Sequence, residues 1–218
     1  MEADQGGGPF GLRLSEGLGC NAQAVARERA VLFSAPMIRA LLAGTKTQTR
    51  RALRGFYPQN TPEYDSASGR LEWFNGDEVV CGIRCPYGQP GDLLWVREAF
   101  SGSIAYERHG YPLRQWGNKI WYWADGNPQR GDWTKPRPSI HMPRHLSRLT
   151  LKIADVRVER LQDISDADAR AEGIVLQPGG VGYGLDDGSH FHGTDPRLSY
   201  FSLFEAINGP GIVDANPW

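Results

Sequence analysis

The sequence predicts a mixed α+β fold that is rich in strands and loops, and three observations support this prediction. The hydrophobic share of 40% and the charged share of 22% are near the averages for folded domains. The 27 Gly and 15 Pro residues indicate many turns and irregular connections. Short alternating segments lie between these turns, while other segments carry helix-start and helix-end signals. With 218 residues, the chain can bury a sizeable core in one domain or at most two.

The overall charge and the cysteine content narrow the function classes. A formal net charge of −1 excludes a bulk polycation, so any nucleic-acid contact must come from a local patch. The cysteines Cys20, Cys81 and Cys85 form no obvious disulfide framework and suit a reducing cytoplasm. No apolar run approaches the roughly 18 residues of a membrane span, and the N-terminus lacks the apolar core of a secretion signal. We therefore expect a cytoplasmic protein with no membrane association.

Residues 1–30 predict a flexible extension or, as an equal alternative, an artefact of an upstream start codon, because they are rich in Gly and Ala and lack a sustained period of 2 or 3.6. The folded domain is expected over residues 31–218. It begins with a short strand at 31–33, and a short amphipathic helix follows. Ser34 is the expected N-cap of this helix and Gly44 ends it.

Further strands are expected between turns rich in Gly, Pro and Asn. Two of them lie at 70–74 and 78–83. The sequence PYGQPGD then gives a double turn signal, and DLLWVREAF, which ends at residue 100, reads as a strand. Residues 101–138 are aromatic and broken by turns, with KIWYWAD at 119–125 as the most strand-like part.

The C-terminal third alternates between strand and helix signals. Residues 149–161 predict one long strand or two strands with a bend. Ser165 and Asp168 then form a capping box, and the helix that they start ends at Gly173. The last helix is expected to begin with Asp195 as its N-cap and to end at Asn208-Gly209. Its apolar stripe consists of Tyr200, Leu203, Phe204 and Ile207.

Lys46, Thr49 and Glu98 form the candidate catalytic group. A desolvated Lys can act as a base, a Thr hydroxyl can attack a carbonyl, and a carboxyl group can pass a proton to a leaving amine. The alternative is that Lys46 and Thr49 are exposed strand residues and that Glu98 pairs with an Arg. In a regular strand, positions 46 and 49 face opposite sides about 10 Å apart, so a bend after Gly44 is needed to bring them together.

Glu98 lies in an unusual setting for a carboxylate. Alternation in DLLWVREAF places it on the same face as Leu94, Val96 and Phe100. A carboxylate on an apolar face needs a cation or a hydrogen-bond donor, or its pKa rises. Either outcome is typical of catalytic acids and also of structural ion pairs. The candidate partners are Lys46, Arg50 and Arg51.

Two cysteines and two histidines at equal spacing resemble a set of zinc ligands. They are Cys81, Cys85, His141 and His145. However, 55 residues separate the two pairs. If the stretch around Pro143 is extended, its two His side chains start about 13 Å apart, too far for one ion. We therefore expect no metal and no other cofactor, and we interpret these residues as buried thiols and surface imidazoles.

Residues 130–160 are basic in an otherwise balanced chain. They hold eight Lys or Arg residues and three acidic residues, a net charge of +5. Stacking surfaces lie nearby, and this combination is expected where single-stranded RNA or a nucleobase is held. The aromatic residues are Trp121, Tyr122, Trp123 and Trp133. The alternative is that these rings fill a small core while alternate Arg side chains face water.

The motif LLAGTKTQTRR, followed by GQPGDLLWVREAF, resembles the ASCH family of PUA-like β-barrels. Gly44, Lys46 and Thr49 in the first motif and Glu98 in the second match the polar cluster of that family. The rest of the chain is similar to a longer bacterial and phage-associated branch, including PSIHMPRHLSRLTLKIADVRVERLQDISDADARAEGI and the closing INGPG and DANPW. The likeness covers roughly residues 31–218, and the motifs together are far more specific than any one alone.

This resemblance implies a small PUA-like β-barrel with flanking helices, long loop insertions and a polar cleft suited to RNA or a modified nucleoside. Small bacterial members of the family hydrolyse N4-acetylcytidine with the matching Lys, Thr and Glu. Transferred to this chain, Thr49 is the nucleophile, Lys46 activates it, and Glu98 donates the proton to the leaving amine. Other members are RNA-binding or ribonuclease-like, so a non-catalytic RNA-binding module and a ribonuclease using the same cleft are the alternatives.

Substrate or nucleic-acid contacts are expected from cationic and aromatic residues around these motifs. They are Arg50, Arg51, Trp95, Arg97, Trp123, Arg144 and Arg148. In the RNA-binding alternative, Lys46, Arg50 and Arg51 hold phosphate and the tryptophans stack on bases. Glu98 is then a structural counter-ion.

The chain departs from the family pattern in two ways. Insertions at 55–90 and 101–138 are much longer than in the compact amidohydrolases, and we expect them to reshape or cover the cleft. The branch also normally continues past DANPW into a final apolar strand. A chain that ends at Trp218 is therefore expected to leave a barrel edge unpaired.

Overall fold

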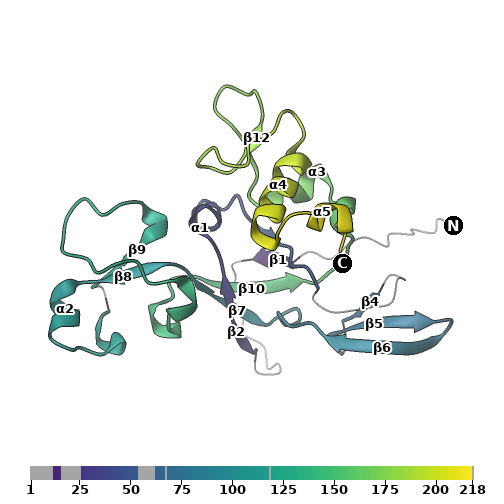
Figure 1. The fold of residues 1–218 in the computed structure, drawn as a ribbon. Helices are drawn as coiled ribbons and strands as arrows, with labels where there is room; N and C mark the ends of the chain where they lie inside the picture. The colour runs from purple at the N-terminus through teal and green to yellow at the C-terminus, as the bar shows by residue number, and fades with distance from the viewer. Residues whose placement is uncertain (1–11, 16–25, 54–61, 67, 118, 218) are drawn as a thin grey trace.

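The computed structural model describes residues 12–15, 26–53, 62–66, 68–117 and 119–217. They form an α+β structure with four small sheets and five α-helices, which confirms the predicted fold class at this level. The largest sheet has five strands in the order β2-β7-β10-β1-β3 (Figure 1). These strands are β1 Leu12–Ser15, β2 Glu28–Leu32, β3 Gln48–Thr49, β7 Leu93–Arg97 and β10 Thr150–Asp155. Strands β2 and β7 are parallel, and the other neighbours are antiparallel.

Strand β1 corrects the prediction that residues 1–30 are a flexible extension. It is an inner strand of the large sheet, between β10 and β3. Strand β2 also begins within the predicted extension, at Glu28. A strand of four residues is too short to show a clear alternation, and its partners are distant in the sequence, so the local pattern does not reveal it. Residues 1–11 and 16–25 lie outside the described part of the chain.

Helix α1, Ala35–Leu42, follows β2 as predicted. Ser34 is its N-cap, and the chain leaves the helix through Gly44, whose φ of +73° favours glycine. The backbone N–H groups of Thr45 and Lys46 both donate to the carbonyl oxygen of Ala40, at 2.9 and 3.1 Å. This bend turns the chain from α1 into β3.

A three-stranded antiparallel sheet projects from one end of the large sheet (Figure 1). Its strands are β4 Glu63–Asp65, β5 Arg70–Asn75 and β6 Glu78–Arg84. Strands β5 and β6 confirm the two strands predicted at 70–74 and 78–83. Leu71 and Trp73 in β5 are fully buried and belong to the main hydrophobic core.

Residues 100–117 and 119–148 form a lobe at the other end of the large sheet, which we call the β8–β9 lobe (Figure 1). Its elements are β8 Phe100–Gly102, α2 Ile104–Arg108, β9 Ile120–Tyr122 and the 3₁₀ helices η1 Leu113–Gln115, η2 Trp123–Asp125, η3 Ser139–His141 and η4 Arg144–Leu146. The lobe has its own hydrophobic cluster of Phe100, Trp116, Met142 and Leu146. It is therefore packed around a centre separate from the main core.

The predicted strand DLLWVREAF is two strands in different sheets. Strand β7 ends at Arg97, whereas β8 begins at Phe100 and pairs with β9. The strand predicted at 119–125 is also shorter, because η2 follows β9. The predicted apolar face is nevertheless buried throughout, at Leu94, Val96, Glu98 and Phe100.

The C-terminal third supplies the remaining helices. Its elements are η5 Leu161–Asp163, α3 Asp166–Ala171, β11 Val175–Leu176, β12 Tyr183–Gly184, α4 Pro196–Asn208 and α5 Ile212–Ala215. Ser165 caps α3 and Asp195 caps α4, as predicted, each accepting a hydrogen bond from a backbone N–H in the first turn. The strand predicted at 149–161 is limited to β10. On α4, Ile207 departs from the predicted stripe because it is exposed, whereas Tyr200, Leu203 and Phe204 are buried.

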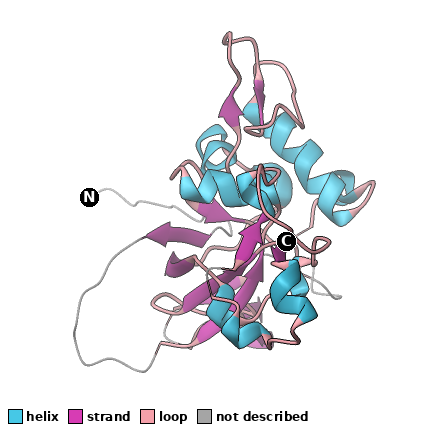
Figure 2. Ribbon diagram, turned by 90° about the vertical axis from the view of Figure 1, so that its left-hand side faces the viewer, coloured by secondary structure: helices cyan, strands magenta, loops and turns pink. Residues whose placement is uncertain are grey.

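Figure 2 shows most of the helices gathered on one side of the strands. The main core contains Ile38 from α1, Leu94 from β7 and Ile153 from β10, all fully buried. The outer strands of the large sheet are β2 and β3, and no pairing that joins them is found among the described residues. No helix in the described part of the chain is both long enough and apolar enough to cross a bilayer.

The packing of the β8–β9 lobe depends on Gly102. A Cβ atom at this position would lie 1.8 Å from the ring of Trp116, a buried member of the lobe cluster. Because Trp116 must move, we expect Gly102→Ala to lower the free energy of unfolding by about 1–3 kcal/mol, measured by urea denaturation. Gly193→Ala is the control, because a Cβ atom there meets nothing within 4 Å. Equal stability of the two variants would contradict this packing.

Candidate functional site

Strand β3 and the residues next to it direct three polar side chains toward helix α3. Lys46, Gln48 and Arg50 recur at every second position, so they share one side of the extended chain. All three are buried, and each contacts Asp168 or Glu172. The end of α3 therefore lies against β3.

Lys46 and Glu172 form a buried ion pair. The Nζ atom of Lys46 donates to Oε2 of Glu172 at 2.7 Å and to its backbone oxygen at 2.8 Å. The two side chains are 0% and 3% exposed. Burial lowers the pKa of Lys46, and the Glu172 carboxylate opposes this shift. The second carboxylate oxygen, Oε1, is buried and accepts no hydrogen bond from the described residues.

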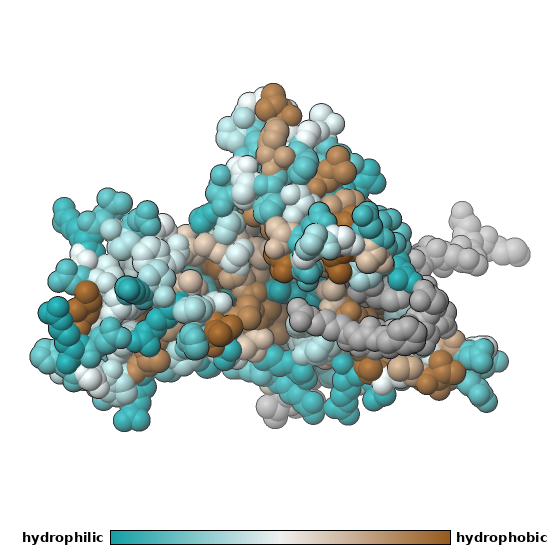
Figure 3. Space-filling model, viewed as in Figure 1, coloured by the Kyte–Doolittle hydropathy of each residue, from teal (hydrophilic) through white to brown (hydrophobic). Residues whose placement is uncertain are grey.

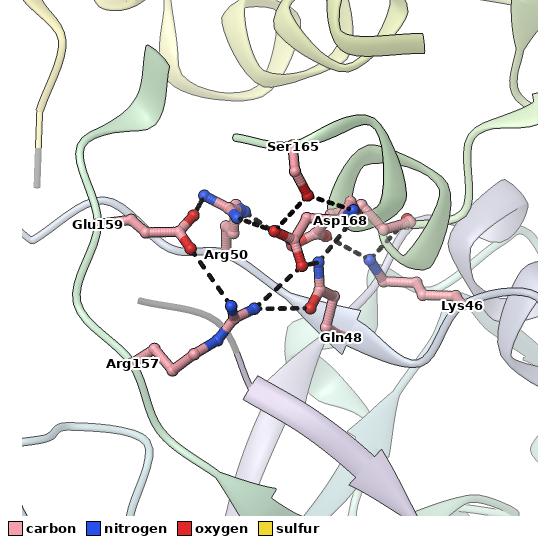
Figure 4. Close-up of polar contacts among 8 residues, drawn as sticks. Lys46, Gln48, Arg50, Arg157, Glu159, Ser165 and Asp168 are labelled. Carbon is pink, nitrogen blue, oxygen red and sulfur yellow. Dashed lines mark hydrogen bonds and ion pairs between the residues drawn. The ribbon is translucent and has the colours of Figure 1, made fainter. Parts of the chain in front are cut away.

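Four more charged groups extend this pair into a network (Figure 4). The Arg50 guanidinium pairs with Glu159 and lies 3.4 Å from Oδ2 of Asp168. Arg157 contacts both of these carboxylates, Asp168 at 3.1 Å and Glu159 at 3.5 Å. Three cations thus face three carboxylates, and the network as a whole is neutral.

A small cavity lies beside Thr49, between β3 and α4, and we call it the Thr49 cavity. It is lined by Met37, Thr49, Arg50, Arg51, Glu172, Tyr200, Leu203, Phe204, Ile207 and Asn208. Its volume of about 30 Å³ has room for about two water molecules. The Thr49 hydroxyl makes no hydrogen bond with the described residues. Lys46 is not on the cavity wall, so Glu172 is the residue that links Lys46 to the cavity.

Glu98 lies in a different polar cluster, between β7 and β8. Its two carboxylate oxygens accept hydrogen bonds from Nε and Nη2 of Arg148, at 2.8 and 2.9 Å. Arg148 also donates to Asp125, and its guanidinium lies 4.2 Å from the ring centre of Tyr122. Burial raises the pKa of Glu98, and the paired Arg148 opposes this rise. Glu98 is not among the residues that line the Thr49 cavity.

Arg50 and Arg51, predicted to contact substrate or phosphate, have contacts inside the chain. The Arg50 side chain is 5% exposed and held in the charge network. Arg51 donates from Nη2 to the backbone oxygen of Leu32 at 2.7 Å and lies 5.3 Å from the ring centre of Phe33. Because Lys46 is also buried, the described structure presents neither Lys46 nor Arg50 to a phosphate in solvent.

The other predicted contact residues lie near β7 and in the β8–β9 lobe. Arg97 lies over the ring of Trp95, 4.5 Å from its centre, and Trp95 is itself buried. The indole N–H of Trp123 donates to the hydroxyl of Ser101 at 2.8 Å. Arg144 forms two hydrogen bonds with the carboxylate of Glu28, and Arg148 is held by the Glu98 cluster.

No protein-family model, curated protein or solved structure matches this chain. The resemblance to the ASCH family therefore stays a prediction.

Sequence reasoning did not identify the carboxylates that partner the cations around β3. Glu172 is the C-cap of α3, Asp168 belongs to the predicted capping box, and Glu159 follows β10. Each has an ordinary local explanation in the sequence as a helix-capping or alternating polar residue. The signal that could have pointed to them is the recurrence of Lys46 and Arg50 on one face of a buried strand, because such charges need partners.

The Lys46–Glu172 pair gives a direct test of the network. Removing one partner leaves the other charge buried and unpaired, which typically costs about 3–5 kcal/mol. We therefore expect Lys46→Met and Glu172→Leu each to lower the free energy of unfolding by about this amount. The double variant should recover much of the loss. Glu107→Gln, which breaks an exposed pair with Arg137, is the control with a much smaller effect. Additive losses in a double-mutant cycle would contradict a direct interaction.

The acid stability of the chain should depend on Asp168. Burial alone would raise its pKa, but hydrogen bonds from Ser165, Gln48 and Arg157 outweigh burial and lower the pKa from 3.8 to about 2. The folded state thus favours the ionised form, so this stabilisation is complete above about pH 4 and is lost as the pH falls toward about 2.

We expect Asp168→Asn to be less stable than the wild type at neutral pH. The difference should shrink between about pH 4 and about pH 2, as measured by urea unfolding at several pH values. Asp163→Asn, which removes an exposed carboxylate of η5, is the control measured in the same way. A constant difference for Asp168→Asn across this range would contradict the assignment.

Proposed function

We propose that this protein hydrolyses the amide of an acylated nucleobase or nucleoside, such as N4-acetylcytidine, at the Thr49 cavity. One observation carries the proposal. The Thr49 hydroxyl, without a hydrogen bond to the described residues, lines the same cavity as Glu172, the carboxylate that holds the buried Lys46. A nucleophile (Thr49) and an acid–base group (Glu172) thus line one cavity, and a cation (Lys46) contacts the acid–base group. The sequence resemblance assigns the same roles of nucleophile and activating group to Thr49 and Lys46.

The proposed first step is attack by Oγ1 of Thr49 on the acyl carbonyl carbon. The hydroxyl proton passes to Glu172 Oε1, the buried oxygen that accepts no hydrogen bond from the described residues. The carbon–nitrogen bond breaks as the same proton moves to the leaving amine, and an ester on Thr49 remains. Water then hydrolyses this ester, releases the carboxylic acid and restores the hydroxyl.

Lys46 acts on this reaction through Glu172. Its ammonium is held 2.7 Å from Oε2 of Glu172 and places a positive charge beside the carboxylate that accepts the proton. Because burial lowers the pKa of Lys46, it also releases a proton more readily than an exposed lysine does. Arg51, which lines the cavity together with Arg50, can stabilise the negative charge of the tetrahedral intermediate.

The size of the cavity supports a small acyl group as the buried part of the substrate. A volume of about 30 Å³ suits two or three non-hydrogen atoms, which is the scale of an acetyl group. The base and ribose must then lie outside the cavity, or α4 side chains such as Phe204 must move. The burial of Lys46 and Arg50 weighs against the alternative in which they hold phosphate.

Glu98 is the proton donor assigned by the resemblance. Its raised pKa suits an acid, but both carboxylate oxygens are bonded to Arg148. In our proposal Glu172 transfers the proton in the Thr49 cavity. Glu98 instead has a structural role where the chain enters the β8–β9 lobe. The proposal also includes the family relation, in which the five-stranded sheet belongs to a PUA-like barrel.

Acetate release from N4-acetylcytidine tests the proposal. We expect Thr49→Val, which keeps the side-chain shape but removes the hydroxyl, to lower kcat/KM by about a hundredfold or more. Thr49→Ser should retain measurable turnover, because it keeps the nucleophilic oxygen. Glu172→Gln should lose as much activity as Thr49→Val. Glu98→Gln tests which of the two carboxylates, Glu98 or Glu172, transfers the proton. Glu205→Gln, on α4 but outside the cavity lining, is the control.

Two results would overturn parts of the proposal. Full activity in Thr49→Val would remove the nucleophile, and with it the proposed reaction. Loss of activity in Glu98→Gln, with Glu172→Gln unaffected, would return the proton-donor role to Glu98. Circular dichroism of each variant separates lost chemistry from lost folding.

A further inference from the structure

The β8–β9 lobe carries an open groove that the Thr49 cavity does not include. The groove has a volume of about 610 Å³, within the range of small-ligand sites. Its lining includes Ile104, Glu107, Arg108, Trp133, Lys135 and Arg137. These residues come from α2 and from the extended segment that precedes η3.

The charge of the chain is divided unequally between this lobe and the rest. Residues 100–148 hold eight Lys or Arg residues and three acidic residues, a net charge of +5. The whole chain has a net charge of −1, so the remainder carries −6. Figure 3 shows the lobe, at the left of the view, with a mainly hydrophilic surface. An anionic partner is therefore attracted to the lobe and repelled by the rest of the chain.

The groove presents cations that the described residues leave unpaired. Arg108 and Lys135 are exposed, and neither has an ion pair with a described carboxylate. In contrast, Arg137 is paired with Glu107 at 2.6 Å and lies over the ring of Trp116. Two cations on the groove wall are thus available to a ligand without breaking an existing ion pair.

An aromatic ring lies beside these cations. Trp133 is half-buried in the groove wall, and its indole N–H donates to the backbone oxygen of Arg130 at 2.8 Å. A second ring, Trp121, lies 5.8 Å away and is tilted by 48° relative to Trp133. The polar edge of the indole is therefore satisfied internally, and its ring system contributes to the wall as a stacking surface.

The segment that carries these side chains is held against β8. Arg137 and Phe100 exchange backbone hydrogen bonds of 2.7 and 3.2 Å. The backbone N–H of Thr134 donates to Gly102, whose own N–H donates to the Thr134 hydroxyl. The groove wall is thus ordered before a ligand binds, which reduces the entropy cost of binding.

We propose that this groove binds single-stranded nucleic acid, with Trp133 stacking on a base while Arg108 and Lys135 contact phosphates. A single strand fits these groups because its bases are free to stack on a protein ring, whereas those of a duplex are stacked on each other. An acidic peptide would satisfy the cations but would not use the ring. This site is independent of hydrolysis at Thr49.

Fluorescence anisotropy with an unmodified, dye-labelled oligonucleotide of about 12 nucleotides tests the proposal. The titration is made at several salt concentrations. We expect Arg108→Glu with Lys135→Glu to weaken binding by tenfold or more, and to reduce the slope of log K against log salt by about 1.4, since each lost phosphate contact contributes about 0.7. Lys152→Glu, an exposed cation on β10, is the control and should bind much more tightly than the double variant.

A second set of variants tests the ring. Trp133→Ala should weaken binding about tenfold and leave the salt slope unchanged, while Trp133→Phe should retain most of the affinity. Thr49→Val should bind like the wild type, so failure of this site and failure of the hydrolase are distinguishable. Equal weakening by Lys152→Glu, equal competition by polyglutamate, tighter binding of a duplex, or no binding at low salt would each overturn the proposal.

Discussion

The rest of the structure depends on the neutral network of buried charges between β3 and α3. Three cations, Lys46, Arg50 and Arg157, meet the carboxylates of Glu159, Asp168 and Glu172. Buried charges are tolerated only when they are paired, so β3, α3 and the segment after β10 must pack together for any of them to be satisfied. The network thereby holds the end of α3 against β3, and with it Glu172 on the wall of the Thr49 cavity.

This constraint joins stability to the proposed chemistry. The ammonium of Lys46 is linked to the cavity through Glu172, so in the proposed reaction the two residues serve both structure and catalysis. Such coupling is common where a site needs a group with a shifted pKa, because the burial that shifts the pKa also needs a compensating partner. Thr49 contributes no hydrogen bond within the described residues and is the component most clearly suited to a substrate.

The molecule also divides into two regions of different charge and packing. The main core joins the large sheet to α1 and α4, while the β8–β9 lobe is packed around Phe100 and Trp116. Glu98 lies where the chain passes from one region to the other. Its two hydrogen bonds from Arg148 stabilise this connection. A basic lobe next to an otherwise acidic chain concentrates positive charge in one region without making the whole protein basic.

Local signals in the sequence were enough to predict the features that depend on neighbouring residues. Ser34 and Gly44 flank the first helix, Ser165 caps α3, and the alternation around Glu98 correctly predicted a buried carboxylate. Strand β1 and the partner of Lys46 were decided only by the tertiary structure. Capping and alternation act over a few neighbouring residues, whereas a short strand and a buried charge are each stabilised by groups brought from distant parts of the chain.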